Sequence, residues 1–277
     1  MLGRMRLSCL PVSYFNRIVS GRMSLGEWAR EGAALGLEAI DVSILFLQGR
    51  EPGYLSRLRR EVEQEGIRIC EATTYPDFTH PDPDERERQV AQCRLDLEAL
   101  AGIGAQLVRI TAGQAHPELG TETGIERVLA AFHQAAAWAR SCGLQLVFEN
   151  HSRPGVWQFP DFAFPTAIFL RLAESLRDTP ILIQFDTANP IAFGDDPLPI
   201  LEKVIDRVRV VHASDTRVRG RLDPTVIGTG LVPFDSLFRR LKASGYDHWV
   251  SIEEASGTGP RGVAAAVEFV RSAWERA

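Results

Sequence analysis

Long apolar runs are absent from this sequence of 277 residues. No stretch of about 18 apolar residues occurs, and the N-terminus (MLGRMRLSCLPVSYF) has neither a long apolar core nor a small-residue cleavage site. The sequence therefore predicts no membrane-spanning helix and no secretory signal. We expect a cytoplasmic protein without a membrane partner.

Cysteine is scarce, and no two cysteines form a CxxC pair. Wide spacing of this kind does not predict a disulfide framework. We expect reduced thiols at all four positions, which are Cys9, Cys70, Cys93 and Cys142.

A basic excess is also missing. The chain has 31 Lys and Arg residues against 36 Asp and Glu residues, which gives a formal net charge of -5. Proteins that bind nucleic acid usually display an excess of positive charge. The composition therefore argues against a nucleic-acid partner and favours small-molecule chemistry.

Strand and helix patterns alternate along the whole chain, and no linker or low-complexity segment interrupts them. Predicted strands cover residues 7–12, 38–43, 67–72, 107–111, 145–149, 181–185, a run that ends at 212, and 249–253. Predicted helices follow them, beginning with one that starts at residue 24 and ending with one that starts at residue 263. We therefore expect one domain over residues 1–277, an α/β fold that forms a (β/α)8 TIM barrel of eight parallel strands. The alternative, a doubly wound open sheet, usually carries GxGxxG in its first turn, where this chain has CLPVSYF.

Four predicted strands end on side chains that bind metals or transfer protons. The runs LQLVFEN, ILIQFDT, VRVVHAS and WVSIEEA contain Glu149, Asp186, His212 and Glu253. The carboxyl ends of parallel strands share one face of a barrel, so these side chains should converge there. Three carboxylates and one imidazole form a donor set that suits a divalent cation.

Alternation along each strand predicts which side chains point inward. Glu149 falls on the inward side of its strand, and in the last strand Glu253 does so rather than Glu254. Arg109 also points inward, where a buried guanidinium requires a carboxylate or a bound anion. We therefore assign Arg109 to the site or to its immediate surroundings.

Each of these residues also has an ordinary interpretation. An acidic residue at a strand end is most often a helix cap or a solvated loop charge, and His212 alone could be a hydrogen-bonded core histidine. Their joint occurrence is different, because close carboxylates repel one another unless a cation or a proton separates them. The loop histidines His80, His116 and His151 could be exposed or could bind substrate hydroxyls.

Several runs resemble those of a known superfamily: FENH (148–151), FDTANP (185–190), VHASD (211–215), GTGLVPF (228–234) and SIEEASG (251–257). They are similar to the xylose isomerase-like barrels, and most to the sugar phosphate isomerase/epimerase branch, which includes ketose 3-epimerases, hydroxypyruvate isomerases and inosose dehydratases. The resemblance implies one Mn2+ or Mg2+ ion, with Zn2+ or Co2+ as alternatives, held by Glu149, Asp186, His212 and Glu253. It also implies that Glu149 and Glu253 act as the acid/base pair.

The resemblance further implies an isomerase or epimerase that acts on a small ketose, sugar phosphate or keto-polyol by proton transfer through a metal-bound enediolate. A cation that chelates a carbonyl oxygen and its neighbouring hydroxyl lowers the cost of that intermediate, and two carboxylates can remove and return the proton. If the acid instead protonates a departing hydroxyl, the same intermediate leads to dehydration. An inosose-type dehydratase therefore stays open as an alternative.

Two further alternatives belong to other functional classes. Apurinic endonucleases of the same superfamily hold three zinc ions with extra histidines, but the matching positions here are Asn189 and Thr225. With those ligands missing and an acidic net charge, a metal-dependent phosphodiesterase is disfavoured. A barrel that binds a sugar or polyol without turnover would use the same residues and stays open.

The loops after the strands supply candidates for substrate recognition. The expected substrate contacts are Arg109, His116, His151, Trp157, Asn189, Asp215, Arg217 and Arg219. The run SGTG (256–259) precedes the last helix as a phosphate-binding loop does, although its glycines could equally serve only to turn the chain. The sequence leaves open whether the protein forms a homo-oligomer.

Overall fold

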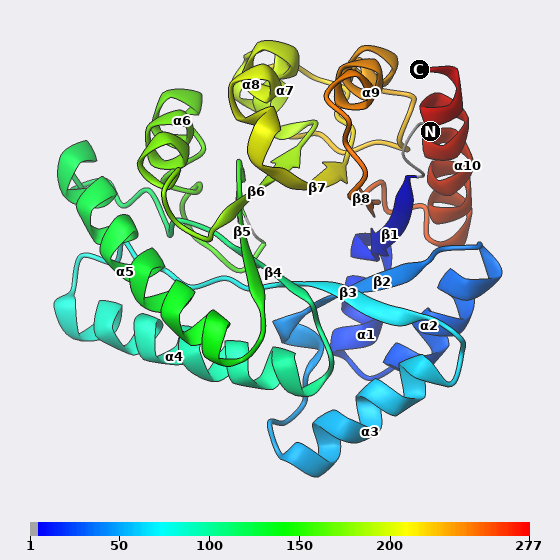
Figure 1. Cartoon of the computed structure of the whole chain (residues 1–277), viewed down its shortest axis with the longest axis horizontal. Helices are drawn as coiled ribbons and strands as arrows, with labels where there is room; N and C mark the ends of the chain where they lie inside the picture. Colours follow the sequence, from blue (N-terminus) through cyan, green and yellow to red (C-terminus); the bar gives the residue numbers. More distant parts are fainter. Residues whose placement is uncertain (1–4, 154) are drawn as a thin grey trace.

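The computed structural model describes residues 5–153 and 155–277, and it shows eight parallel strands inside a ring of helices (Figure 1). The predicted (β/α)8 fold is confirmed. The strands are β1 (Arg6–Leu10), β2 (Ala39–Ser43), β3 (Arg68–Thr73), β4 (Leu107–Ile110), β5 (Gln145–Glu149), β6 (Leu182–Asp186), β7 (Val208–Ala213) and β8 (Trp249–Glu253).

Helices connect successive strands and cover the outside of the barrel. They are α1 (Phe15–Val19), α2 (Leu25–Ala34), α3 (Pro52–Glu63), α4 (Pro83–Gly102), α5 (Thr121–Ser141), α6 (Thr166–Ser175), α7 (Asn189–Phe193), α8 (Pro197–Val204), α9 (Phe234–Ala243) and α10 (Pro260–Arg276). Short 3-10 turns cover Val12–Tyr14, Ile44–Phe46 and Ile205–Arg207.

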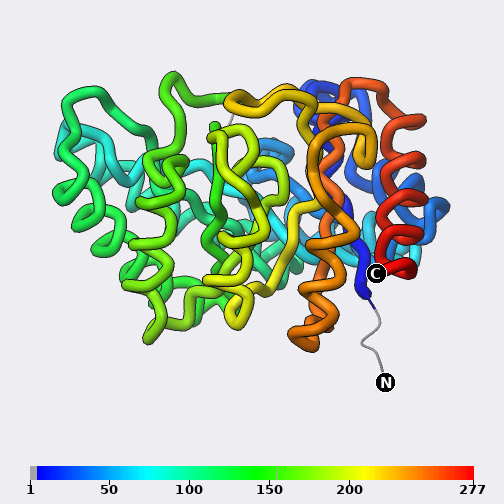
Figure 2. The backbone as a smooth tube through the Cα atoms, turned by 90° about the horizontal axis from the view of Figure 1, so that it is seen from above, coloured from blue at the N-terminus to red at the C-terminus, as the bar shows by residue number. Residues whose placement is uncertain are grey.

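The strands follow the order β1-β8-β7-β6-β5-β4-β3-β2, so the first two strands stand at the two ends of the sheet. They lie side by side (Figure 1), and the backbone N–H of Glu38 donates to the carbonyl of Leu7 at 2.9 Å. The last helix returns to the beginning of the chain, where Arg271 donates to the carbonyl of Gly36 just after α2 (Figure 2). The barrel is therefore nearly closed.

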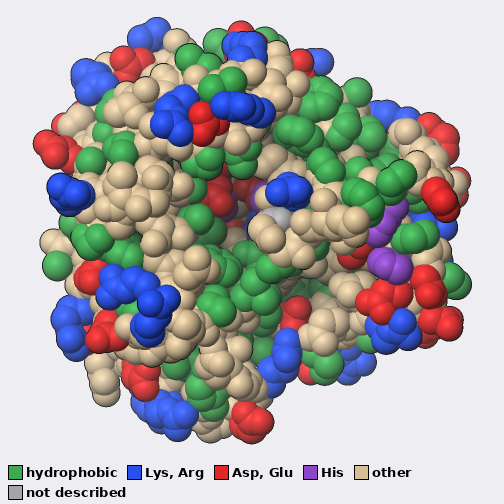
Figure 3. Space-filling model, turned by 180° about the vertical axis from the view of Figure 1, so that it is seen from behind, with side chains coloured by type: hydrophobic (Ala, Val, Ile, Leu, Met, Phe, Trp, Pro, Cys, Tyr) green, Lys and Arg blue, Asp and Glu red, His purple; other side chains and the backbone are tan. Residues whose placement is uncertain are grey.

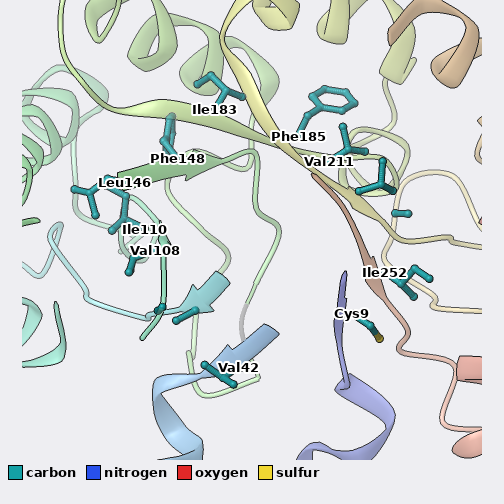
Figure 4. Packing of buried hydrophobic residues seen from close by; sticks show 14 of the residues in the cluster. Cys9, Val42, Val108, Ile110, Leu146, Phe148, Ile183, Phe185, Val211 and Ile252 are labelled. Carbon is teal, nitrogen blue, oxygen red and sulfur yellow. The ribbon is translucent and has the colours of Figure 1, made fainter. Parts of the chain in front are cut away.

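Side chains on the strands alternate between two apolar layers, as the sequence patterns predict. Residues such as Ile110, Phe148 and Ile183 lie between the strands and the helices (Figure 4). Side chains of the opposite parity fill the inside of the barrel toward the amino ends of its strands. We call this group the barrel floor; it consists of Ala39, Cys70, Leu107, Val147, Leu182, Val210 and Trp249. The floor leaves only the carboxyl ends of the strands for a site.

Side-chain caps set the first residues of two helices. At α2, Ser24 Oγ accepts from Glu27 N–H at 3.1 Å, and Glu27 Oε2 accepts from Ser24 N–H at 2.7 Å, which is a capping box. The helix α4 begins at Pro83, because Asp82 supplies the cap. The helices α1 and α7 were not predicted, since five residues are too few to show a helical period.

All four cysteines are free thiols, and Cys9, Cys70 and Cys93 are buried. Among the described residues, no helix combines the length and the apolar character needed to cross a membrane.

Candidate metal centre and substrate pocket

Four side chains from four strands meet at the carboxyl ends of the barrel. Glu149, Asp186 and Glu253 are the last residues of β5, β6 and β8, and His212 lies one residue before the end of β7. One donor atom from each of the four lies within 4.8 Å of the others. We call these residues the central cluster. They converge because each occupies the inward side of its strand at nearly the same height.

His212 stands between the two glutamates of the central cluster. Its Nδ1 lies 2.8 Å from Glu149 Oε1 and 3.3 Å from Glu253 Oε2, but it makes no hydrogen bond with any described residue. Its Nε2 lies 2.8 Å from Gln184 Nε2. A buried nitrogen without a partner, facing two carboxylates, is what a shared cation would satisfy. The donor set therefore fits a divalent metal.

Asp186 is held in one orientation by three donors. Its Oδ1 accepts from the backbone N–H of Ala188 at 2.8 Å and of Asn189 at 2.6 Å, where α7 begins, and its Oδ2 accepts from Ser214 Oγ at 2.6 Å. Partners of this kind orient a ligating carboxylate. The two backbone bonds also make Asp186 part of the turn that starts α7.

Arg109 has the carboxylate partner that its inward position requires. Its Nη1 donates to Glu149 Oε2 at 2.8 Å and its Nη2 to the carbonyl of Thr74 at 3.3 Å. The guanidinium also lies 5.0 Å from the centre of the Tyr75 ring. This pairing uses one oxygen of Glu149 and leaves the other facing His212.

Burial and neighbouring charges shift the pKa values of the central cluster in opposite directions. Burial raises the pKa of Glu149, but the charges of His212 and Arg109 outweigh burial and hold that pKa well below its usual range. Burial, with Glu253 and Glu149 adding to it, raises the pKa of Asp186 well above its usual range. Burial lowers the pKa of His212, but the surrounding carboxylates, Glu149 first, outweigh it and raise that pKa well above its usual range. Asp186 and His212 therefore hold a proton more strongly than free side chains do, and a divalent cation would compete with that proton.

Glu71 is a buried carboxylate next to the central cluster that the sequence patterns did not predict. Neither of its oxygens has a hydrogen-bond partner among the described residues, and burial raises its pKa to about 7. It points inward because β3 carries one extra residue: Ile40 pairs with Ile69, but Val42 pairs with Ala72. Such a bulge breaks the alternation on which the prediction depended.

Asp41 is a second unpredicted carboxylate, and it lies below Glu71 in the barrel. It accepts from Ser8 Oγ at 2.7 Å, from Ser251 Oγ, and from the backbone N–H of Glu71 at 3.1 Å. Burial raises its pKa. A signal was present, because Asp41 is a charged residue inside the apolar run AIDVS and shares the inward side of Ala39.

A pocket of about 560 Å³ opens above the central cluster. Figure 3 shows it as a hollow with acidic side chains at its base and mostly hydrophobic side chains around it. Four of the predicted substrate contacts line it, namely Arg109, His151, Asn189 and Asp215. The volume suits a small molecule.

The other four predicted contacts are not among the residues that line this pocket. Their polar groups instead bond to other residues of the protein. His116 Nε2 lies 2.8 Å from Asp77 Oδ2, Trp157 Nε1 donates to the Tyr75 carbonyl at 3.3 Å, Arg217 pairs with Asp223 at 2.7 Å, and Arg219 donates to the carbonyls of Gly194 and Asp195 at 2.9 Å. Arg217 pairs within its own loop, and the other three side chains bond to neighbouring loops.

Asp215 lines the pocket, but its carboxylate is occupied by hydrogen bonds to the backbone. It accepts backbone N–H bonds from Thr216, Gly228, Gly230 and Val232 at 2.9 to 3.1 Å. A Cβ at Gly230 would lie 2.3 Å from Asp215 Oδ1, so this close approach requires glycine. Asp215 therefore ties the loop between β7 and α9 to the end of its strand.

His151 keeps a free nitrogen at the pocket wall. Its Nδ1 lies 3.9 Å from Asp161 Oδ2, and neither atom has a hydrogen-bond partner among the described residues. Burial lowers the pKa of His151 to about 4. The imidazole is therefore neutral at pH 7 and can offer one donor and one acceptor to a bound molecule.

The run SGTG does not form an open phosphate cradle. The buried carboxylate of Glu254 already lies at the start of α10, where it accepts from the N–H of Ser256 at 2.9 Å and from Ser13 Oγ. A Cβ at Gly262 would lie 2.7 Å from Glu254 Oε1. A phosphate at this helix start would therefore meet a fixed negative charge.

The sequence matches the model of one protein family, described as xylose isomerase-like TIM barrel, over residues 29–273. This chain belongs to the xylose isomerase-like TIM barrel family. The resemblance inferred from runs such as FENH and FDTANP is thereby confirmed.

Among proteins similar to this xylose isomerase-like barrel are inosose dehydratases. That of Geobacillus kaustophilus (strain HTA426) is 24% identical over 282 residues, which covers 90% of this chain and 86% of the relative. That of Lacticaseibacillus casei is 26% identical over 149 residues, and here the chain spans about half the length of the relative, 48%. The family members similar in sequence thus include sugar-modifying enzymes.

Solved structures with the same fold also include sugar-modifying enzymes. The D-psicose 3-epimerase of Clostridium cellulolyticum H10, solved with D-tagatose, has a TM-score of 0.77 at 15% identity and covers 98% of this chain and 99% of its own. The IOLI protein, solved with a zinc atom, has a TM-score of 0.78 at 14% identity with the same coverage. These structures share the fold of the xylose isomerase-like barrel described here.

Proposed function

We propose that this protein moves a proton at the carbon next to the carbonyl of a small ketose, sugar phosphate or keto-polyol, and so epimerises or isomerises it with the help of one divalent metal ion. The observation that carries this proposal is the position of Glu149 and Glu253. They come from β5 and β8, on different sides of the barrel, and both face His212 Nδ1.

The residues of the chain have distinct tasks in this proposal. Glu149, Asp186, His212 and Glu253 would hold the metal, with Mn2+ or Mg2+ preferred and Zn2+ or Co2+ as alternatives, since hard oxygen donors dominate the set. When bound, such an ion polarises a carbonyl group and acidifies the neighbouring C–H bond. One glutamate removes the proton, and the other returns a proton on the opposite face or on the adjacent carbon.

The charges around the pocket leave one place where a phosphate could bind. The start of α10 is occupied by the carboxylate of Glu254, and Arg109 in the pocket is already paired with Glu149. Arg153 also lines the pocket, and among the described residues it makes only a long hydrogen bond of 3.5 Å to the carbonyl of Gln158, so its charge is available to a phosphate. Asn189 and the neutral His151 offer hydrogen bonds for hydroxyl groups.

Dehydration is the second candidate, and the sequence relatives named inosose dehydratase favour it. It would begin with the same proton removal, after which one carboxylic acid protonates a departing hydroxyl. The two reactions therefore share the base that removes the first proton. They differ in whether the acid gives its proton to a carbon atom or to the departing hydroxyl.

One experiment tests the proposal and separates the two candidates. The purified protein, loaded with Mn2+ or Mg2+, is incubated in D2O with a panel of ketoses, sugar phosphates and inososes, and the products are followed by NMR. Epimerisation or isomerisation should place deuterium at a carbon next to the carbonyl without loss of mass, whereas dehydration should remove one water and create an enone or diketone. If none of these sugars exchanges a proton while the metal is bound, the proposal is wrong.

We also propose that residues 1–277 form one domain and that the protein is cytoplasmic.

A further inference from the structure

A second group of metal-binding side chains lies in two loops at the carboxyl end of the barrel. Asp77 and His80 belong to the loop between β3 and α4, and His116 belongs to the loop between β4 and α5. One donor atom from each lies within 4.8 Å of the other two. We call these three residues the loop cluster. The function proposed above does not use them.

The two histidines of the loop cluster are not ordinary surface residues. His116 Nε2 lies 2.8 Å from Asp77 Oδ2, and the two imidazole rings meet edge to face with centroids 5.1 Å apart. His80 Nδ1 is shielded from solvent and has no hydrogen-bond partner among the described residues. A shielded polar atom without a partner costs free energy, and a bound metal ion would remove that cost.

The carboxylate of the loop cluster is held in a fixed orientation. Asp77 Oδ1 accepts from the backbone N–H of Gln114 at 2.9 Å and from Thr79 Oγ1 at 3.0 Å, and Oδ2 accepts from Gln114 Nε2 at 2.9 Å. Outer hydrogen bonds of this kind are typical of carboxylates that bind metals. Asp77 is thus oriented before any ion arrives.

Gly113 allows the two loops to approach each other. Its φ is +116°, and a Cβ there would lie 2.7 Å from the backbone nitrogen of Phe78 and 2.8 Å from Asp77 Oδ1. Both the backbone conformation and the close contact require glycine. Because Gly113 has no side chain, the two loops can pack closely enough for His116 to reach Asp77 and His80.

The loop cluster is also connected to the loop that carries His151. Gln114, which binds Asp77, uses its Oε1 to accept from the backbone N–H of Gln158 at 2.8 Å and of Phe159 at 3.0 Å. The His116 ring contacts the Phe159 ring, with centroids 5.4 Å apart. Fixing His116 and Asp77 would therefore also fix the segment over residues 151–165 beside the pocket.

We propose that Asp77, His80 and His116 bind a second divalent metal ion of the zinc type, and that this ion braces the 151–165 loop. Two imidazoles and one carboxylate suit Zn2+ better than Mg2+, whereas the oxygen-rich central cluster suits harder ions. Zinc bonds of about 2.0 to 2.2 Å place tetrahedral ligand atoms roughly 3.4 Å apart, and a water molecule would complete the tetrahedron. His116 Nε2 and Asp77 Oδ2, now 2.8 Å apart, would therefore separate slightly as both turn to the ion.

The test counts metal ions on full-length protein that was first stripped with a chelator. Wild type and the His80→Ala/His116→Ala double variant are equilibrated with Zn2+, desalted and analysed for zinc per chain. We expect two ions on the wild type and one on the double variant. His133→Ala, which removes an exposed histidine of α5, is the matched control and should keep two.

A variant without the central cluster makes the zinc count at the loop cluster independent of the proposed activity. Asp186→Ala/His212→Ala removes two ligands of the central cluster, and this variant should still bind one Zn2+, which His80→Ala/His116→Ala should then abolish. Zn2+ should also slow proteolytic cleavage within residues 151–165 at least several-fold in this background. If it binds no zinc although circular dichroism shows it folded, or if the loop variants bind as much as their parents, the loop cluster is only a hydrogen-bonded group and the inference is wrong.

Discussion

Glu71 lies behind His212, with its Oε2 3.6 Å from His212 Nε2, on the side of the ring opposite to Glu149 and Glu253. The imidazole is therefore surrounded by carboxylates at both nitrogens. Gln184, at 2.8 Å from the same Nε2, is a neutral neighbour that adds no charge. This arrangement concentrates negative charge around one ring and explains why the central cluster needs protons or a cation.

Glu71 should make the stability of the metal-free protein depend on pH. Its ordinary pKa of 4.5 rises to about 7 in the folded protein because of burial. Between these values the folded state binds the proton and the unfolded state does not, so stability is full below about pH 4.5 and falls as pH rises to about 7. The loss attributable to Glu71 should be on the order of 3 kcal/mol. Urea unfolding at pH 5 and pH 7.5, with chelator present, measures it.

The variant Glu71→Gln removes this titration, so its stability should change less between the two pH values than that of the wild type. Glu202→Gln, an exposed position on α8, is the control and should behave as the wild type. Equal pH dependence in Glu71→Gln and in the wild type would contradict the prediction.

Metal binding by the central cluster should depend on Asp186 and His212 and should weaken at low pH. Both groups have raised pKa values in the metal-free protein, so the ion must displace their protons, and affinity should increase as pH rises. Calorimetry with Mn2+ in buffers of different ionisation enthalpy would measure both the affinity and the protons released.

The variants Asp186→Ala and His212→Ala should lower Mn2+ affinity by a factor on the order of 100 while the barrel stays folded. Ser214→Ala, which removes one partner of Asp186, should have a smaller effect, about 10-fold. Unchanged affinity in both ligand variants would place the metal elsewhere.

Glu149→Gln and Glu253→Gln should abolish most turnover while preserving the fold. Removal of a positioned acid or base costs a factor on the order of 100 or more, and glutamine still offers one oxygen to the metal. Kinetics on a substrate identified from the sugar panel, together with Mn2+ binding, would check both points. Near-normal turnover in both variants would reject the two-carboxylate mechanism.

The two variants should also differ in deuterium exchange. The variant that keeps the base facing the substrate proton should still incorporate solvent deuterium, whereas the other should not. If both lose exchange equally, one glutamate performs both proton transfers.

The buried pair of Arg109 and Glu149 should matter far more for stability than a similar pair on the surface. Arg109 is 3% exposed and Glu149 is 0% exposed, so Arg109→Met leaves a buried carboxylate without its partner and should cost on the order of 3 kcal/mol. Arg171 and Glu122 form the matched surface pair, at 2.8 Å with side chains 50% and 74% exposed. Urea unfolding of Arg171→Met should show a much smaller loss, because solvent screens this pair. Similar losses in the two variants would contradict this account.

The central cluster could be located from sequence because two regular features coincide in it. Each residue ends a strand, and each occupies the inward parity of that strand, so one-dimensional spacing is enough to bring Glu149, Asp186, His212 and Glu253 together. Arg109 followed from the same alternation. The preference for Glu253 over Glu254 also came from it, and Glu254 does lie at the start of α10.

The sequence did not predict the positions of residues that lie outside the regular alternation of the strands. Glu71 follows a bulge, which shifts the alternation by one residue without a clear sign in the run RICEAT. The loop residues have no period that predicts a direction. His116, Trp157 and Arg219 bond to neighbouring loops, and Arg217 pairs within its own loop. Loop side chains are positioned by tertiary contacts that spacing alone does not encode.

The barrel floor closes the pocket toward the amino ends of the strands. Trp249, Val147 and the other floor residues fill the lower part of the barrel, so a molecule bound at the central cluster has no way out through that end. Under the proposed function, substrate and product both pass through the face at the carboxyl ends. A product molecule that dissociates slowly blocks binding of the next substrate molecule. The product should therefore act as a competitive inhibitor, and its inhibition should be stronger the more slowly it dissociates.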